Sequence, residues 1–351
     1  MSAAFRSIIA IAVAVAATAA LALGAGGAAA SPAPGLTARA ASLLPPAGSV
    51  FTGTSAGPAG SFASEVGKHP AIYGEFVHWG QSIGFAFTSA AAAHATLMLH
   101  LQTYAGTGPE AITPQQIAAG AGDRYLVTLN GLIAHFGKPV YIRLLPEMNQ
   151  ANNPYCAFNP DGSSRGPAFA PSAFVAAWRR VVTIVRGGSV ASIDSALAAL
   201  GQTRLHGLGA GATLASTPVS FVWTPQVAGA PDIPANGPAA YYPGDAYVDW
   251  VGTDFYSKFP NFTGLDTFYK QFAQRPFAFG EWAIWGGDNP GFVSQLFAWV
   301  NAHHRVRMML YNQGFNMFSL TADPASSAAI RQQLAPARYL GYTPEWQGAA
   351  N

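Results

Sequence analysis

The sequence alternates between short apolar runs and longer stretches with helical periodicity, and this alternation constrains the fold more than any other feature. Eight apolar runs are bounded by turn signals, and they read SVFTG, AIYGEFVHW, TLMLHLQT, PVYIRLLPE, VSFVWTP, YVDWVGTDFY, PFAFGEW and RMMLYNQG. Between them lie stretches such as residues 112–137 and 171–188, in which apolar residues recur at intervals of three and four. Strands that alternate with helices predict βα units around a parallel sheet.

Eight strands in this arrangement predict a (β/α)8 barrel, the α/β architecture known as the TIM barrel. An open doubly wound sheet is the alternative, but no G-x-G-x-x-G motif follows the first strand. No repeat of fixed period and no long polar linker divides the chain. We therefore expect a single barrel domain over residues 49–351.

The amino-terminal residues have the pattern of a secretory signal peptide. Arg6 supplies a positive charge, residues 8–23 form an apolar stretch, and small residues over 24–30 suit a cleavage site. The apolar stretch is shorter than the roughly 20 residues that a membrane-spanning helix needs. We expect cleavage after Ala30, a short Pro- and Ala-rich tether over residues 31–48, and a secreted, extracellular protein without stable membrane association.

Charge and cysteine content exclude several classes of function. Charged residues make up 10% of the chain, the formal net charge is +2, and no cluster of Lys or Arg could follow a phosphate backbone, so nucleic acid is not an expected partner. Cys156 is the only cysteine, which excludes an intramolecular disulfide, and its Pro- and Asn-rich surroundings do not suggest a nucleophile. We expect no metal, no cofactor and a monomeric protein.

Two glutamates stand at the ends of predicted strands. Glu147 follows the fourth strand directly, and Glu281 follows the seventh. In a (β/α)8 barrel, catalytic groups lie at the carboxyl ends of the strands, so both side chains are expected in the open mouth. Either glutamate alone could be a structural ion-pair partner or a helix cap. As a pair they suit glycoside hydrolysis, which needs one protonated carboxyl and one ionised carboxylate in different surroundings.

Several motifs together resemble family 26 of the glycoside hydrolases, retaining (β/α)8 enzymes best known as β-mannanases. The resemblance covers residues 49 to the carboxyl end and is densest over 141–287, and its motifs are RLLPEMN, AWRRVVTIVR, FVWTP, YYPGDAYVDWVGTDFY and FAFGEWAIWG. It implies that Glu147 is the general acid/base and Glu281 the nucleophile. It also implies that Arg143 and Tyr256 lie beside the nucleophile. Retention further requires the two carboxyls to be about 5–5.5 Å apart.

The sequence departs from the family pattern in ways that leave the substrate open. Pro146 stands where the family usually has a histidine, and proline donates no side-chain hydrogen bond. Tyr311 on the eighth strand stands where an aromatic platform is usually a tryptophan. Residues 189–216 lengthen the connection before the fifth strand, and their role is open.

Further substrate contacts are expected at the ends of the strands, where aromatic rings could meet the flat apolar face of a sugar. The candidates are Trp79, Trp223 and Trp285, together with His78 and Asn149. Core packing is the alternative for the tryptophans, and capping of the loop is the alternative for Asn149.

The sequence thus predicts a secreted retaining endo-glycosidase that hydrolyses a β-linked polysaccharide by double displacement, with β-1,4-mannan as the first candidate. One alternative is the same chemistry on another β-glucan or on xylan. Another is a carbohydrate-binding barrel without catalysis.

Overall fold

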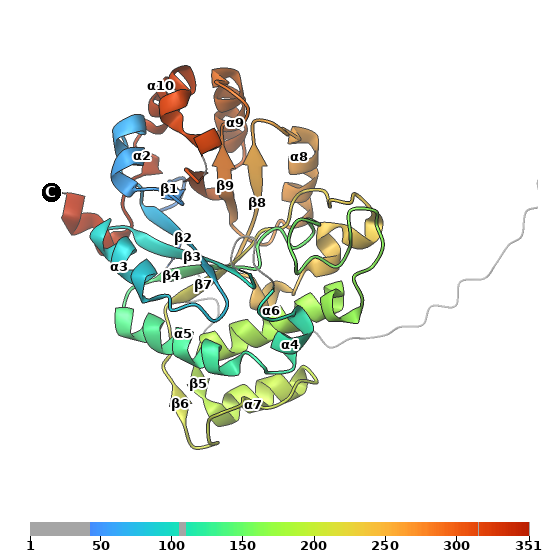
Figure 1. Ribbon diagram of the computed structural model, residues 1–351. Coiled ribbons are helices and arrows are strands. Elements are labelled where there is room, and N and C mark those ends of the chain that lie inside the picture. The colour runs from blue at the N-terminus through green and yellow to red at the C-terminus, as the bar shows by residue number, and fades with distance from the viewer. Residues whose placement is uncertain (1–42, 105–109, 315, 351) are drawn as a thin grey trace, which may run out of the picture. The chain divides into compact units, whose positions relative to one another are not determined.

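The computed structural model describes residues 43–104, 110–314 and 316–350, and eight of its strands close into a parallel barrel (Figure 1). This confirms the predicted fold and all eight predicted strands. The barrel strands are β1 (Val50–Ser55), β2 (Ile72–His78), β3 (Thr96–Gln102), β4 (Val140–Leu144), β7 (Val219–Trp223), β8 (Trp250–Tyr256), β9 (Phe277–Ala283) and β10 (Val306–Asn312).

The barrel closes where β10 pairs with β1, in parallel like the other barrel pairs. A short ninth strand, β11 (Tyr339–Leu340), adds to the amino end of β1. The expected signal peptide and residues 31–42 of the expected tether lie outside the described residues. No helix in the described part of the chain is long and apolar enough to span a membrane.

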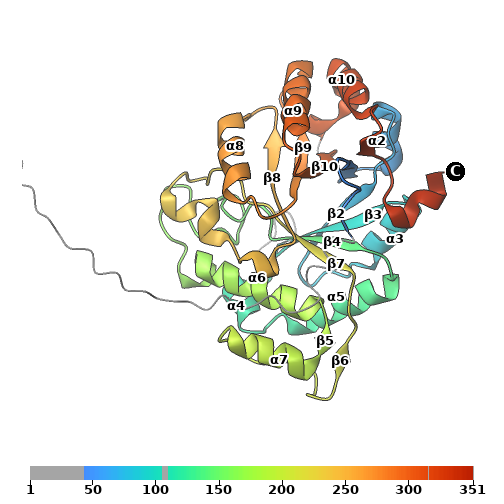
Figure 2. The ribbon, with the colours of Figure 1, turned by 180° about the vertical axis from the view of Figure 1, so that it is seen from behind.

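Helices follow most strands and surround the barrel (Figures 1 and 2). After β7, only short 3₁₀ turns precede the next strand. The helices are α2 (Ala59–Val66), α3 (Gly84–Ala92), α4 (Pro114–Ala118), α5 (Asp123–Phe136), α6 (Pro171–Val185), α7 (Val190–Ala199), α8 (Phe262–Gln271), α9 (Pro290–Ala302) and α10 (Pro324–Leu334).

The helical pattern over residues 112–137 forms two helices rather than one. Thr113 begins α4 with a capping box that includes Gln116. Gly120 then adopts a left-handed φ of +92°, which glycine tolerates and which ends the helical path before α5 begins. Periodicity alone did not reveal this break, because apolar residues recur at intervals of three and four on both sides of it.

Side chains that point into the barrel form layers, because successive residues of a strand face opposite sides. The layer at the amino ends of the strands is apolar, and its buried members are Phe51, Met98, Tyr141, Trp250 and Met308. One layer further along, the interior becomes polar, since His100 follows Met98 by two residues and Arg143 follows Tyr141 by two. The polar layer lies directly beneath the carboxyl ends of the strands.

A β-bulge in β9 turns Glu281 toward the interior. Phe279 pairs with Thr253 of β8, and the next pair joins Glu281 to Asp254, so β9 carries one additional residue, Gly280. The pairing of β9 with β10 is irregular at the same place. Phe279 packs outward against α9, and strict alternation would point Glu281 outward as well. The bulge removes that constraint.

The long connection before β7 folds back onto α5 and α6. It contains α7 and a two-stranded antiparallel pair, β5 (Gly188–Ser189) with β6 (Thr213–Leu214). A buried ion pair holds its loop, because Arg180 of α6 binds both carboxylate oxygens of Asp123 and also donates to the Thr203 carbonyl at 2.8 Å. These contacts hold residues 189–216 against α5 and α6.

Both ends of the described chain meet at the amino ends of the strands. Residues 43–48 precede β1, and Leu43 is buried against the apolar layer, with its carbonyl accepting a hydrogen bond from the Tyr141 hydroxyl. At the other end, Glu345 accepts a hydrogen bond from Thr96, at the start of β3. Leu43, the first residue that the structure describes, is thus already packed against the barrel.

Candidate active site

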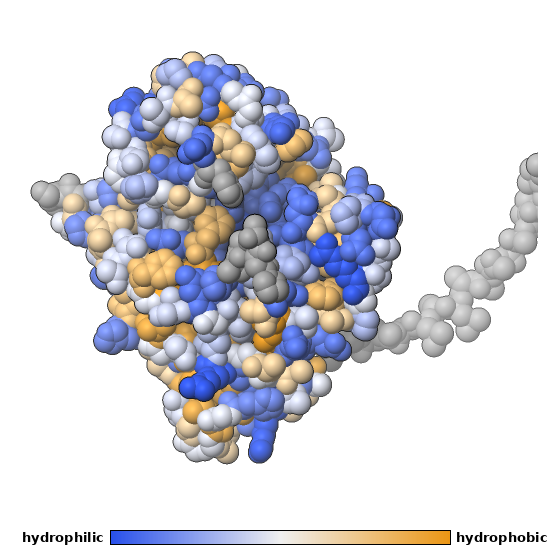
Figure 3. Space-filling model, in the orientation of Figure 1, coloured by the Kyte–Doolittle hydropathy of each residue, from blue (hydrophilic) through white to orange (hydrophobic). Residues whose placement is uncertain are grey.

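A pocket of about 1090 Å³ opens at the carboxyl ends of the barrel strands. In the space-filling view this face of the molecule is hollowed near its centre (Figure 3). Three carboxylic acids, several amides and several aromatic rings line the pocket, and none of its described lining residues is a lysine, arginine or histidine. The lining residues are Ala56, Phe76, Gln102, Tyr104, Glu147, Gln150, Asn152, Asn153, Gln226, Asp254, Tyr256, Phe259, Glu281, Trp285, Asn312, Gly314 and Phe318.

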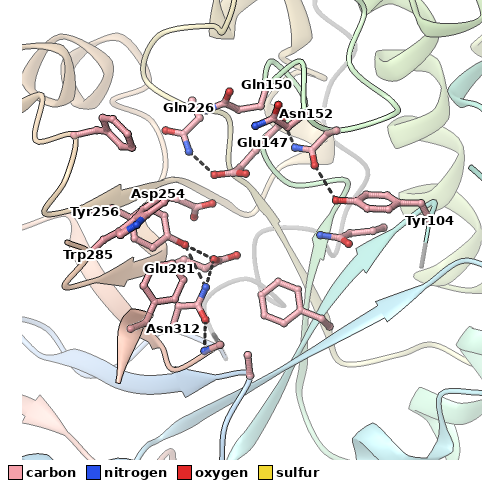
Figure 4. Close-up of a pocket in the computed structure, with 17 residues that line it drawn as sticks. Tyr104, Glu147, Gln150, Asn152, Gln226, Asp254, Tyr256, Glu281, Trp285 and Asn312 are labelled. Carbon is pink, nitrogen blue, oxygen red and sulfur yellow. Dashed lines mark hydrogen bonds between the residues drawn. The ribbon is translucent and has the colours of Figure 1, made fainter. Parts of the chain in front are cut away.

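Glu281 is held by three hydrogen-bond donors. Arg143 Nη1 donates to its Oε1 and forms a buried ion pair with it. The Tyr256 hydroxyl donates to Oε2 at 2.5 Å, and Asn312 Nδ2 donates to the same oxygen at 2.6 Å (Figure 4). A positive charge and two neutral donors favour the ionised carboxylate. Arg143 and Tyr256 therefore lie where the resemblance placed them, next to Glu281.

Arg143 is fully buried, and each side of its guanidinium group is bound. Nε donates to Thr224 Oγ1 at 2.7 Å, Nη2 forms an ion pair with Asp254, and Nη1 also lies 2.8 Å from His100 Nδ1. Because arginine can only donate, Nδ1 must accept, and the ring hydrogen of His100 is on Nε2. Burial first, and then the charge of Arg143, lower the pKa of His100 well below its usual range, so the imidazole is neutral.

The backbone around Glu147 has an unusual conformation. Leu145 and Glu147 both have left-handed φ values, 43° and 53°, which are uncommon for residues with a side chain. Pro146 lies between them, and its carbonyl accepts a hydrogen bond from the Tyr155 hydroxyl at 2.7 Å. The Glu147 amide donates to the Thr224 carbonyl at 2.8 Å. These bonds fix the turn that points the Glu147 carboxyl into the pocket.

The Glu147 carboxyl has different surroundings from those of Glu281. Gln226 Nε2 donates to its Oε1 (Figure 4). Burial, followed by the negative charge of Glu281, raises the pKa of Glu147 above its ordinary range, while Arg143 opposes the shift. Glu147 thus retains its proton to higher pH than an ordinary glutamate.

Asp254 is a third acid in the same cluster. Burial raises its pKa well above the usual range, and the charges of Glu281 and Glu147 add to this effect. Three carboxyl groups thus lie around a single guanidinium group, and burial together with mutual repulsion raises the pKa of two of them, Glu147 and Asp254.

This arrangement can supply a proton donor and an anionic nucleophile to one ligand, because a protonated Glu147 and an ionised Glu281 face the same pocket. Within the described residues, no group of three or more His, Cys, Asp or Glu side chains is arranged to hold a metal ion. Cys156 lies outside the pocket and is buried, and burial raises the pKa of its thiol.

The predicted substrate contacts are only partly brought together. Trp285 lines the pocket, and its ring packs edge-on against Tyr256. Trp223 is fully buried among Tyr242, Phe268 and Phe272 on the outside of the barrel, which corrects the expectation that it contacts the ligand. It is the last residue of β7, and its side chain faces the helices rather than the mouth.

The other three candidates also lie outside the pocket lining, and two of them, Asn149 and Trp79, are buried, which corrects the assignment of those two. Asn149 is fully buried, and its amide accepts from the Gln226 N–H and donates to the Gln226 carbonyl, so it caps the loop. Trp79 is buried against Tyr125, with ring centroids 5.0 Å apart. His78 is only partly exposed, and its Nδ1 lies 3.4 Å from the Trp79 carbonyl oxygen.

Sequence reasoning missed several pocket residues. Asn312 ends β10 and Gln226 lies three residues past β7, so the rule that site residues follow the strands could have identified both. Phe76, which lines the pocket, lies inside β2, and His100, buried beneath it, lies inside β3; the apolar runs there gave no sign of a polar network.

No family model matches the sequence, and no curated protein matches it. Solved structures with similar folds include the catalytic domain of a family 26 endo-β-1,4-mannanase from Bacillus sp. JAMB-750, with 14% identity, coverage of 89% of this chain and 93% of that one, and a TM-score of 0.57. A mannanase from Bacillus subtilis has 15% identity and a TM-score of 0.56, and the match covers 88% of this chain and 90% of that one. An endo-β-1,4-mannanase double mutant from Cellulomonas fimi has 15% identity and a TM-score of 0.55, and the match covers 89% of this chain and 76% of that one. These likenesses establish the (β/α)8 fold.

Proposed function

We propose that the protein is a retaining endo-glycosidase that hydrolyses a β-linked polysaccharide, with Glu147 as the general acid/base and Glu281 as the nucleophile. The observation that carries the proposal is the contrast between two glutamates in one pocket. Glu281 receives hydrogen bonds from Arg143, Tyr256 and Asn312, whereas burial keeps Glu147 protonated to higher pH. Two carboxyls with separate protonation states are what glycoside hydrolysis requires.

Two displacements complete the reaction. In the first, Glu147 donates its proton to the glycosidic oxygen while a carboxylate oxygen of Glu281 attacks the anomeric carbon, so the bond to the leaving sugar breaks and a glycosyl ester forms. In the second, the Glu147 carboxylate takes a proton from water, whose oxygen attacks the anomeric carbon and releases Glu281. Arg143, Tyr256 and Asn312 stabilise the carboxylate before and after the ester exists.

The lining favours an uncharged sugar polymer. It contains amides and aromatic rings beside three acids, and its described members include no cationic side chain that could pair with a uronate. Amides bind hydroxyl groups, and aromatic rings cover the apolar face of a pyranose. The resemblance in sequence, together with the mannanases of similar fold, supports β-1,4-mannan as the first candidate. Pro146, in place of the usual histidine, keeps other neutral β-glucans and xylan as alternatives.

The test is reducing-sugar release from a panel of neutral β-glycans by the wild-type protein and by the Glu147→Ala and Glu281→Ala variants. If the wild type releases sugar from mannan and both variants do not, the proposal is supported. If the wild type acts on another glycan instead, the proposed mechanism stands and the proposed substrate is replaced. Glycan binding without release at any pH from about 4 to 8 would favour the non-catalytic barrel instead.

The stereochemistry gives an independent check on the mechanism. A nuclear magnetic resonance spectrum recorded early in the reaction should show the β-anomer of the new reducing end, because two displacements retain configuration. The α-anomer as first product would exclude Glu281 as a covalent nucleophile.

We also propose that the protein is secreted and loses residues 1–30. Amino-terminal sequencing of protein from the culture medium would test this, because an intact signal region on the exported protein would contradict it.

A further inference from the structure

Phe76 presents one face of its ring to the pocket. It lies on β2, lines the pocket and is partly exposed. Its other face covers the His100 imidazole, with ring centroids 4.4 Å apart and planes inclined by 22°. A ring stacked on one side and open to a pocket on the other offers a flat apolar surface to a ligand.

The position of this ring is tied to that of Glu281. His100 is fully buried beneath Phe76, and its Nδ1 lies 2.8 Å from Arg143 Nη1, the nitrogen that also donates to Glu281. His100 Nδ1 itself lies 3.8 Å from Glu281 Oε1. Phe76, His100, Arg143 and Glu281 therefore form a continuous set of contacts, and Phe76 and Glu281 line the same pocket.

Other aromatic residues near Glu281 are less suited to this role. Tyr311, the aromatic residue of the eighth strand, is fully buried, and its hydroxyl donates to the Phe318 carbonyl at 3.0 Å. Trp285 packs against neighbouring rings, and the Lys258 ammonium lies 4.8 Å from its ring centre.

We propose that Phe76 forms the apolar floor of the sugar subsite beside Glu281, on which the flat C–H face of an uncharged pyranose ring stacks. Gln102, two residues after His100 on β3, also lines the pocket and offers an amide to the hydroxyl edge of that sugar. The inference rests on the proposed function, because it assigns a specific sugar contact to the same pocket.

The test separates binding from turnover. In the Glu147→Gln background, which slows the reaction, binding of mannohexaose is measured by calorimetry for the parent and for the additional Phe76→Leu and Phe76→Tyr changes. Leucine keeps an apolar side chain but loses the flat face, so we expect about tenfold weaker binding, which corresponds to about 1.4 kcal/mol. Tyrosine keeps the ring, so we expect affinity within about threefold of the parent. Phe85→Leu is the matched control, because Phe85 is an exposed phenylalanine on α3 outside the pocket lining.

A second readout distinguishes contact with the sugar from an indirect effect through His100. With Glu147 intact, Phe76→Leu should raise KM and leave kcat nearly unchanged, because Arg143 still donates to Glu281. Equal affinity of the Phe76→Leu variant and its parent, or a lower kcat without loss of affinity, would overturn the subsite. If the parent bound none of the neutral oligosaccharides of mannose, glucose or xylose, the proposed function would fail and the subsite with it.

Discussion

Arg143 and His100 are register partners on the adjacent strands β4 and β3, and Arg143 Nη1 lies 2.8 Å from His100 Nδ1. The contact joins a permanent cation to a neutral acceptor. Together with this contact, hydrogen bonds to Thr224, Asp254 and Glu281 fix the orientation of the Arg143 guanidinium group.

Replacing His100 should therefore disturb the nucleophile although His100 does not line the pocket. In the His100→Leu variant, Arg143 loses an acceptor, so we expect kcat/KM to fall by at least about tenfold. His100→Asn should recover much of the activity, since its Oδ1 can accept where Nδ1 did. Equal kcat/KM for the leucine variant and the wild type, or no recovery in the asparagine variant, would show that His100 serves packing alone.

The pH profile should be bell-shaped. Glu147 must be protonated in the first step, so activity falls as pH rises through its pKa, and burial together with the charge of Glu281 raises that pKa above the ordinary 4.5. The basic limb of kcat/KM is therefore expected above the ordinary glutamate range. In Glu281→Gln the neighbouring charge is absent, so a carbon-13 titration of Glu147 should give a lower pKa than in the wild type. A higher or unchanged value would contradict the coupling.

Gly280 should tolerate no side chain. A Cβ at this position would lie 2.8 Å from Arg143 Nε and 3.1 Å from Asp254 Oδ1. Gly280→Ala is expected to displace the guanidinium group, to lower kcat by about tenfold or more, and to destabilise the fold by about 1–3 kcal/mol. Gly131→Ala is the control: Gly131 lies within α5, and a methyl group added there would meet no atom within 4 Å, so it should stabilise the fold by about 0.5–1 kcal/mol and leave activity unchanged. Wild-type kinetics in Gly280→Ala would refute the close packing.

The buried pair of Asp123 and Arg180 should matter for stability and not for chemistry. Asp123→Ala would leave the buried guanidinium of Arg180 without its carboxylate, so we expect a loss of about 3–5 kcal/mol in the free energy of unfolding, measured by urea denaturation. The matched control is Asp245→Ala, because Asp245 is largely exposed and lies 4.0 Å from Arg275; little change is expected there. The pH profile of the folded Asp123→Ala protein should coincide with that of the wild type.

Much of this organisation could be predicted from the sequence, because the signals were local. The barrel followed from apolar runs of strand length separated by helical periodicity, and the two glutamates followed from the rule that strand ends meet in the mouth. The direction of Glu281 was not predictable in this way. Its inward orientation depends on a bulge at Gly280, and alternation along β9 by itself would have placed it beside Phe279, outside the barrel.

The aromatic contacts were harder to predict for a related reason. Trp223 and Trp285 both stand near strand ends, yet one faces the helices and the other the pocket. That difference depends on the direction of each side chain and on the course of the loop that follows the strand, and neither can be predicted from the position of a tryptophan near a strand end. The role of His100 depends on the register between β3 and β4, so the sequence of either strand alone could not predict its contact with Arg143.

The two ends of the described chain lie at the amino ends of the strands, where Leu43 accepts a hydrogen bond from Tyr141 and Glu345 from Thr96. The pocket that Glu147 and Glu281 line opens on the opposite face, at the carboxyl ends of the strands. A protein immobilised on a solid support through either end would thus present its pocket to the surrounding liquid, and insoluble polymer could approach without passing the attachment point. In a circular permutant, a short linker could join the two ends on this face, and it would leave the mouth of the barrel unobstructed.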